Sequence, residues 1–199
     1  MENLKAPSAE KIPHELVMHG DKRIDNYYWM RLSDEQKTAD NKDEQTKKVF
    51  DYLNAENAYT KAMLKHTEEF QENLYKEIIG RIKQDDASVP YFKNGYWYYT
   101  RYEEGKEYGI YCRKKGSLEE REEILLDANI LAKDLAYFDL GTLSVSPENK
   151  ILAYTTDVLS RRVYTIHFKN LETQEIYKDT IKGVTGSVAW VDDNKTLFY

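Results

Sequence analysis

The sequence predicts a mainly β protein with an N-terminal α-helical segment, whose β part is an incomplete β-propeller. Three observations predict this fold. Apolar residues recur at helical spacing up to about residue 80, apolar and polar residues alternate with a period of two after Pro90, and a tyrosine-rich unit recurs in the second half. The chain contains 17 tyrosines against 9 glycines and 4 prolines, and tyrosine favours strands that neighbouring residues half cover.

The first 32 residues are expected to form an extended arm. Pro13 disfavours a helical conformation for the residue before it. Three adjacent aromatic residues follow at 27–29, and because exposed apolar clusters mark contact surfaces, we expect the arm to dock on another surface. Ser33 and Gln36 have the spacing of a helix capping box, and the polar stretch 34–48 is expected to be a solvated helix or a loop.

A helical segment is expected from about residue 41 to residue 80. Between Val49 and Ile78 the apolar residues fall at spacings of three, four or six, and Gly80 is a plausible end. We expect a break near residues 65–68, because uninterrupted helices of this length are uncommon in globular domains. The predicted domains are residues 1–84, an N-terminal arm with helices, and residues 85–199, the first blades of a truncated β-propeller domain.

An internal repeat predicts the blades. Residues 92–99, 147–154 and 192–199 align without gaps, and each places an asparagine at a turn and a tyrosine five residues later. The asparagines are Asn94, Asn149 and Asn194, so the periods are 55 and 45 residues. Periods near this length with three or four antiparallel strands are typical of propeller blades. Closing a ring takes at least about four blades, so we expect the chain to be a fragment of a longer protein.

Composition excludes several functional classes. Lysine and arginine total 29 against 35 acidic residues, a net charge of −6, which argues against a nucleic-acid partner. No apolar run reaches the ~18–20 residues of a membrane span, and residues 1–20 lack the apolar core of a secretory signal. We therefore expect a cytoplasmic protein. Cys112 is the single cysteine, so an intrachain disulfide is impossible and a cysteine-rich zinc site is excluded.

No residue of the chain is predicted to be catalytic, cofactor-binding or metal-ligating. The G-x-S-x-G elbow of α/β-hydrolases is absent, and the nearest string, residues 183–187, lacks the second glycine. No G-x-G-x-x-G or Walker motif supports a nucleotide cofactor. Cys112 is expected to be a buried apolar residue. The four histidines are His14, His19, His66 and His167, and we expect them to be scattered over the fold. His66 is expected to pack on the apolar helix face. Metal binding by His14 and His19 is left open.

Two charged motifs are expected on the surface. The run Glu119–Glu123 has the composition of a solvated loop, with cation binding as the alternative. Arg161 and Arg162 follow Ser160 at a predicted hairpin tip, where they form a plain turn or pair with an acidic partner.

Residues 96–99 form a strand whose side chains alternate between two faces. Trp97 and Tyr99 fall on one face, and Tyr96 and Tyr98 on the other. A strand between two blades needs this pattern, and we favour it over a stacking platform for sugar or peptide.

Several strings resemble the prolyl oligopeptidase family, peptidase family S9A. They are residues 13–15 and 19–31, the latter with Asp25-Asn26-Tyr27-Tyr28-Trp29, and residues 52–59, 95–108, 144–154 and 186–190. The order Tyr-Tyr-Trp and then Glu-Asn-Ala is shared with prolyl endopeptidases. The string at 96–105 is most similar to the oligopeptidase B (protease II) branch. The polar stretch 34–48 departs from the shorter Asn-Pro segment through which the family passes to the first helix, so the resemblance does not set where that helix starts.

The resemblance implies a seven-bladed propeller followed by a C-terminal α/β-hydrolase domain with Ser, Asp and His. This chain would hold the arm, the helices and about two and a half blades. The whole enzyme would be a serine oligopeptidase that cleaves short peptides after Lys or Arg, with the propeller gating access. The triad would lie beyond residue 199, so the chain alone is expected to be inactive.

The implied partners are the C-terminal α/β-hydrolase domain and short peptide substrates, without nucleic acid, membrane or cofactor. Residues 27–29 and the helix face with Phe70, Leu74 and Ile78 resemble segments that such a domain covers in the family, and an open propeller leaves a strand edge at 195–199. We expect these surfaces to be buried by self-association or by a placement of the helices that differs from the family. Two alternatives remain open: a non-catalytic, tyrosine-rich β-propeller binding module, and the N-terminal part of a prolyl endopeptidase.

Overall fold

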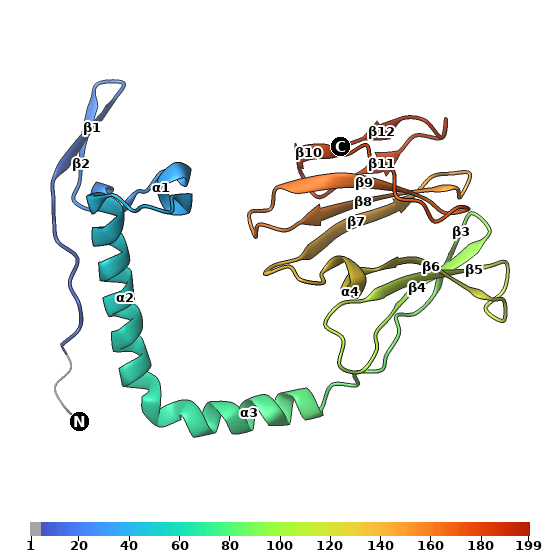
Figure 1. Ribbon diagram of the computed structural model, residues 1–199, viewed down its shortest axis with the longest axis horizontal. Coiled ribbons are helices and arrows are strands. Elements are labelled where there is room, and N and C mark those ends of the chain that lie inside the picture. Colours follow the sequence, from blue (N-terminus) through green and yellow to red (C-terminus); the bar gives the residue numbers. More distant parts are fainter. Residues whose placement is uncertain (1–4) are drawn as a thin grey trace. The chain divides into compact units, whose positions relative to one another are not determined.

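The computed structural model describes residues 5–199, which divide into two compact units (Figure 1). The first unit is Met1–Arg81 and the second is Ile82–Tyr199. The first contains the long helices, and the second contains the stacked sheets. Within the described residues, no helix is both long enough and apolar enough to cross a membrane.

The first unit begins with a β-hairpin where the sequence predicted only an extended arm. Strand β1 (His14–Met18) pairs antiparallel with β2 (Asp21–Asp25). The two turn residues, His19 and Gly20, have φ values of 51° and 83°, and two positive φ angles suit the twist of a two-residue hairpin. The 3₁₀ helix η1 (Tyr28–Met30) follows and contains two of the three adjacent aromatic residues.

Helix α1 (Asp34–Thr38) confirms the predicted capping box. The Gln36 backbone N–H donates to Ser33 Oγ at 3.2 Å, and the Ser33 N–H donates to Gln36 Oε1 at 2.9 Å. Satisfying two N–H groups in this way starts the helix at Asp34. The polar stretch is therefore a short helix, a loop and the first turn of the next helix.

The predicted long helical segment is two helices joined by a break. Helix α2 (Glu44–Leu64) starts after Asp43, whose carboxylate accepts from the Thr46 N–H at 2.7 Å. The 3₁₀ turn η2 (Lys65–Thr67) then leads into α3 (Glu68–Gly80). The break therefore lies where the sequence predicted it.

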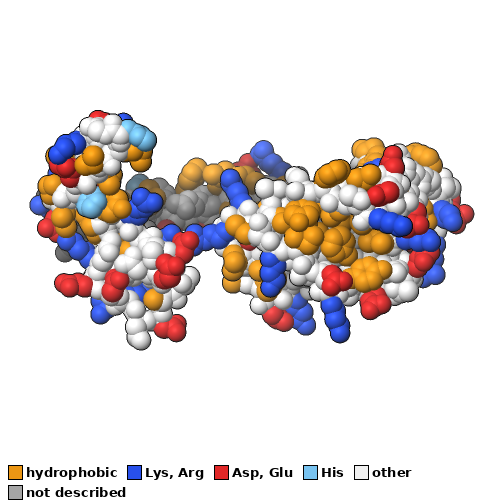
Figure 2. All heavy atoms as spheres, turned by 90° about the horizontal axis from the view of Figure 1, so that it is seen from above, with side chains coloured by type: hydrophobic (Ala, Val, Ile, Leu, Met, Phe, Trp, Pro, Cys, Tyr) orange, Lys and Arg blue, Asp and Glu red, His pale blue; other side chains and the backbone are white. Residues whose placement is uncertain are grey.

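The first unit buries few side chains of its own. Among its described residues only Thr46 and Val49 are buried. Along α3, Phe70, Leu74 and Ile78 share one face at a spacing of four, and all three are exposed. Figure 2 shows exposed hydrophobic side chains on both units.

The second unit contains two complete blades and the first hairpin of a third (Figure 1). Each blade is a four-stranded antiparallel sheet in sequential order. Blade 1 is β3 (Tyr91–Lys93), β4 (Tyr96–Arg101), β5 (Ile110–Lys115) and β6 (Glu122–Asp127). Helix α4 (Ala128–Leu131) leads to blade 2, which is β7 (Asp139–Val145), β8 (Ile151–Asp157), β9 (Tyr164–Asn170) and β10 (Ile181–Val184). Blade 3 begins with β11 (Ala189–Trp190) and β12 (Leu197–Phe198). The predicted incomplete propeller is confirmed.

The repeated asparagines sit at equivalent turns and link successive blades. Asn94, Asn149 and Asn194 have φ values of 48°, 64° and 59°, a left-handed conformation that asparagine tolerates better than most residues. Asn149 Nδ2 donates to the Asn94 carbonyl at 3.0 Å. Asn194 Oδ1 accepts from the Glu148 N–H at 2.8 Å. Each of these two side chains therefore binds the turn of the preceding blade, which explains the repeat seen in the sequence.

The core of the second unit lies between blades 1 and 2. Its buried members from blade 1 are Tyr98, Leu125 and Leu126, and those from blade 2 are Leu152, Tyr154 and Leu171. Their burial stabilises the packing of the two sheets, since a buried Leu side chain contributes roughly 1.5–3 kcal/mol.

Candidate functional site

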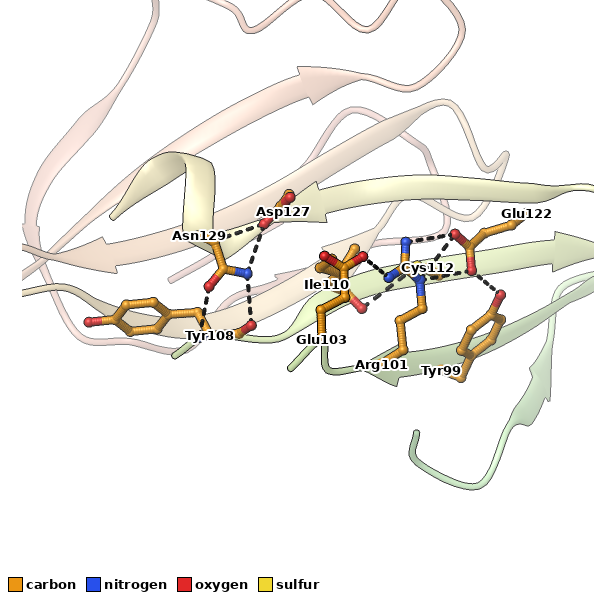
Figure 3. A network of polar contacts seen from close by, with 9 residues as sticks. All are labelled: Tyr99, Arg101, Glu103, Tyr108, Ile110, Cys112, Glu122, Asp127 and Asn129. Carbon is orange, nitrogen blue, oxygen red and sulfur yellow. Dashed lines mark hydrogen bonds and ion pairs between the residues drawn. The ribbon is translucent and has the colours of Figure 1, made fainter. Parts of the chain in front are cut away.

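A polar network covers the face of blade 1 that points away from blade 2. The β4–β5 register pairs Tyr99 with Cys112 and Arg101 with Ile110, and residues paired in this way share a face. Strand β6 adds Glu122, which pairs with Lys114 on the same face. The network therefore joins three strands of one blade (Figure 3).

Glu122 is the central acceptor of this network. Its carboxylate accepts from the Tyr99 hydroxyl at 2.5 Å and from Nε and Nη2 of Arg101 at 3.2 Å. The third guanidinium nitrogen, Nη1, donates to Glu103 at 2.5 Å. Charge-assisted bonds of this kind are stronger than neutral ones and orient the planar guanidinium. Arg101 thus connects β6 to the start of the β4–β5 loop.

Burial and hydrogen bonding shift the ionisation of these groups in opposite directions. Burial raises the pKa of Tyr99, and its hydrogen bond to Glu122 raises it further. Burial also acts to raise the pKa of Glu122, but the bonds from Tyr99 and Arg101 outweigh it and hold that pKa below its usual value. The network is therefore a neutral phenol and an ion pair, which suits a fixed scaffold better than proton transfer.

Cys112 lies under this network and is 1% exposed, which confirms the predicted buried cysteine. Burial raises the pKa of its thiol to about 12. Since the thiolate is the nucleophilic form, this side chain is inert at neutral pH.

The β4–β5 loop is fastened at both ends. Arg101 holds Glu103 at one end, as described above. At the other end the Tyr108 N–H donates to Asn129 Oδ1 at 2.9 Å, and Asn129 Nδ2 donates to the Tyr108 carbonyl at 2.8 Å (Figure 3). Asp127 Oδ1 accepts from the Asn129 N–H at 2.9 Å and orients that asparagine.

A buried carboxylate shapes the β8–β9 hairpin tip, where the sequence predicted a hairpin with two arginines. Asp157 is 1% exposed and accepts from the backbone N–H groups of Leu159, Arg161 and Arg162 at 2.7–2.9 Å. Burial opposes the charge, yet these bonds keep the pKa of Asp157 below its usual value. Both arginine side chains are exposed. The corresponding loop of blade 1 is β4–β5, so the two loops lie at the same end of their blades.

The acidic run at 119–123 divides between two roles. Glu122 belongs to the network, and Glu123 binds Arg113 Nε at 2.8 Å. Arg113 is buried, stacks over the Tyr96 ring at 4.0 Å and donates to the Asn149 carbonyl at 3.1 Å, so it joins the two blades. In residues 5–199 no three His, Cys, Asp or Glu side chains are grouped so as to hold a metal ion.

The four histidines lie apart. His14 stacks on Tyr28 at 3.9 Å, and His19 occupies the hairpin turn. His167 is half-buried, with Nε2 3.0 Å from Thr156 Oγ1, and burial lowers its pKa. The prediction that His66 is packed is wrong. It is exposed in η2, with Nδ1 3.0 Å from the Met63 carbonyl, because no described residue of the first unit covers that helix face.

The alternation predicted for residues 96–99 is confirmed. Tyr98 is buried between the blades, and its hydroxyl donates to Asn149 Oδ1 at 3.3 Å. Trp97 points to the opposite face, where its ring lies 5.1 Å from that of Phe92.

Three residues of these contacts, Arg101, Arg113 and Asp157, were not predicted as functional residues from the sequence. Arg101 stands in one of the strings that carry the family resemblance, and Asp157 immediately precedes the loop with the paired arginines, but neither position alone predicts a network. Within residues 5–199 the geometry brings no nucleophile together with a base. The geometry places the chain in the class of β-propeller proteins built of four-stranded blades. In this chain, two loops at the same end of their blades are held in place by side-chain hydrogen bonds.

Comparison with known proteins gives the family. The family model described as "Prolyl oligopeptidase, N-terminal beta-propeller domain" matches residues 7–199. The chain belongs to this family, as its sequence predicted.

Curated relatives of the chain are named as peptidases. Dipeptidyl aminopeptidase BI of Pseudoxanthomonas mexicana is 41% identical over 97% of this chain. Protease 2 of Moraxella lacunata is 30% identical over 98%. The chain spans 28% of the length of each of these relatives.

Solved structures show the same fold. Oligopeptidase B from Leishmania major matches 94% of this chain and 27% of its own, with a TM-score of 0.79 and 30% identity. A structure from a study of two prolyl endopeptidases matches 97% of this chain and 27% of its own, with a TM-score of 0.74 and 25% identity.

Proposed function

We propose that this chain is the N-terminal part of a serine oligopeptidase that, when whole, hydrolyses short peptides after Lys or Arg. The observation that carries the proposal is the family match over residues 7–199. Similarity to oligopeptidase B at 30% identity and a TM-score of 0.79 supports the Lys/Arg branch, and the resemblance of the string at 96–105 favours it over the prolyl endopeptidase alternative. We propose a cytoplasmic location for the enzyme.

The proposed reaction is acyl transfer by groups outside residues 1–199. A serine attacks the peptide carbonyl, a histidine takes its proton, and an aspartate orients the histidine. The described residues offer no such pair, and the Cys112 thiol is inert. The proposed role of this chain is to gate access, and the fixed loops β4–β5 and β8–β9 support it because they present constant shapes at one end of the blades.

The proposed partner of residues 1–84 is a C-terminal α/β-hydrolase domain. The first unit supports this, because it leaves the α3 face with Phe70, Leu74 and Ile78 exposed and has few buried residues of its own. Residues 85–199 are the proposed propeller part. Without a hydrolase domain these apolar surfaces are proposed to drive self-association, and sedimentation of the 199-residue chain at high micromolar concentration tests this. A strictly monomeric chain would contradict it.

Chromogenic amides of Arg and Lys test the peptidase proposal. The full-length enzyme should hydrolyse them, should lose activity when the serine of a G-x-S-x-G elbow is replaced by alanine, and should leave the matching Pro amide intact. The 199-residue chain should show no turnover. Turnover by this chain that disappears on replacing one of its own serines would overturn the assignment. A natural reading frame that stops after codon 199 would instead favour the non-catalytic binding module.

A second candidate function is release of dipeptides from peptide N-termini. The 41% identity to a protein named dipeptidyl aminopeptidase favours it. Substrates with free and with blocked N-termini separate the two candidates. Cleavage confined to free N-termini supports dipeptide release, and equal cleavage of both forms supports an endopeptidase.

A further inference from the structure

A cavity of about 120 Å³ lies in the wedge between blades 1 and 2. The register places Tyr91 opposite Tyr98 and Lys93 opposite Tyr96, so Tyr91 and Lys93 point to the face of blade 1 that meets blade 2. Across the wedge, Leu143 and Val145 of β7 pack on the shared core. The first strands of the two blades therefore form the walls of a slot.

The lining of the slot runs from buried to exposed residues. Tyr98 and Leu125, which line its inner part, are 7% and 4% exposed. Tyr91 is 60% exposed and marks the mouth, and its ring stacks on Tyr98 at 5.5 Å. The volume is somewhat below the ~150 Å³ of a protein cavity that takes benzene, and that cavity is itself larger than benzene. The slot therefore has room for a single ring, between tyrosines on one wall and Leu143 and Val145 on the other, with polar side chains such as Ser144 and Asn149 beside them.

One charged group of the slot has no counter-ion. Lys93 lines the slot and is exposed, and no hydrogen bond or ion pair of its ammonium group to another residue in the described range is found. On the facing turn, Glu148 is already 3.7 Å from Lys150. A ligand that fills the slot with a ring would therefore meet an ammonium group at the edge, where a carboxylate is the complementary charge.

We propose that this slot binds a monocyclic aromatic group that carries a carboxylate. Two sources share this chemistry, the C-terminal residue of a short peptide and a free aryl-alkanoic acid. The site goes beyond the proposed function, because it takes no part in peptide hydrolysis and is tested by binding alone. A protein that binds the aromatic acid but does not hydrolyse peptides would support the slot and not the peptidase. A protein that hydrolyses peptides but does not bind the acid would support the peptidase and not the slot.

Titration of the tyrosine-ring-labelled protein with four probes tests the site by NMR. The probes are N-acetylphenylalanine, its amide, a tripeptide ending in phenylalanine, and 3-phenylpropionate. We expect saturable shifts of the Tyr91, Tyr98 and Tyr111 rings, and at least fivefold weaker binding of the amide than of the acid. Tighter binding of the tripeptide than of 3-phenylpropionate assigns a peptide source, and the reverse order assigns a free acid.

Two variants and one control locate the binding. Lys93→Gln should abolish the preference for the acid over the amide, and because Lys93 is exposed this variant should fold. Leu143→Trp should fill the slot and abolish ring binding. Lys182→Gln removes an equal charge from β10 and should leave all affinities unchanged. If the slot holds only water, the NMR signals of the tyrosine rings will not shift up to the solubility limit of the probes, and this result would overturn the proposal. Equal affinity for acid and amide would also overturn it.

Discussion

The two units of this chain differ in how their apolar residues are covered. In the second unit, Leu152 lies between two sheets and is 0% exposed, whereas Leu74 on α3 of the first unit is 41% exposed. Both are leucines in regular secondary structure, so the difference lies in tertiary packing and not in local propensity. The comparison shows that the blades supply their own core, while the helices form without one.

The largest effect is expected from the core leucine. Leu152→Ala should lower the free energy of unfolding by about 3 kcal/mol, because it removes a fully buried side chain and leaves a cavity. Leu74→Ala, the matched control, should cost below about 0.5 kcal/mol. Urea unfolding curves measure both. Equal losses would show that the first unit has a core comparable to that of the blades.

The network on blade 1 should give the next largest effect. Glu122→Ala should destabilise the second unit by about 1–2 kcal/mol, because Arg101 and Tyr99 lose their shared acceptor and the pair is only partly exposed. Glu120→Ala removes an exposed glutamate from the preceding turn and serves as the control. Thermal unfolding followed in the far ultraviolet measures the difference, and equal midpoints for the two variants would contradict it.

The link between blades should contribute less. Asn149→Ala loses the side-chain bonds to the Asn94 carbonyl and from the Tyr98 hydroxyl, and also a residue that tolerates a φ of 64°. Asn149→Gly loses only the two bonds, so it should cost about 1 kcal/mol, and the alanine variant should cost more. Urea unfolding separates the side-chain bonds from the backbone contribution. A glycine variant as stable as the native protein would show that the two bonds of the Asn149 side chain contribute nothing.

The smallest effect is a pH dependence that originates at Asp157. Its pKa is lower in the folded chain than in the unfolded chain, so its contribution is present above the unfolded value and is lost as pH falls through the folded value. Asp157→Asn should therefore flatten the decline in stability below about pH 4. Asp192→Asn, at an exposed position, should not. Midpoints of urea unfolding from pH 5 to pH 2 measure this, and parallel profiles for all three proteins would refute it.

The sequence predicted the blades because the repeat and the alternation both reflect local geometry. The helix break and the capping box were predictable for the same reason. The hairpin in the arm was not predictable. Val17 and Ile24 are apolar but exposed, so the alternation of apolar and polar residues is not clear there. The first turn residue, His19, has a positive φ although it is not a glycine, so the sequence does not mark the turn. The exposed position of His66 was missed because an apolar stripe does not reveal whether anything covers it.

The polar network was beyond sequence reasoning for a different reason. Glu122 stands in an obvious acidic run, but which of its members faces Arg101 depends on strand register. A β-bulge between Tyr111 and Cys112 shifts the β5–β6 register. Counting alternate positions from either strand therefore assigns side chains to the wrong face.

The left-handed asparagines also bear on the order in which the protein is made. Asn149 reaches a carbonyl 55 residues earlier in the chain, and the Asn194 side chain binds an N–H 46 residues earlier. During synthesis each new hairpin therefore emerges when its partner turn has already left the ribosome and can fold. The turn of each blade is therefore available before the next hairpin arrives, so blades can be added in one direction at the pace of translation.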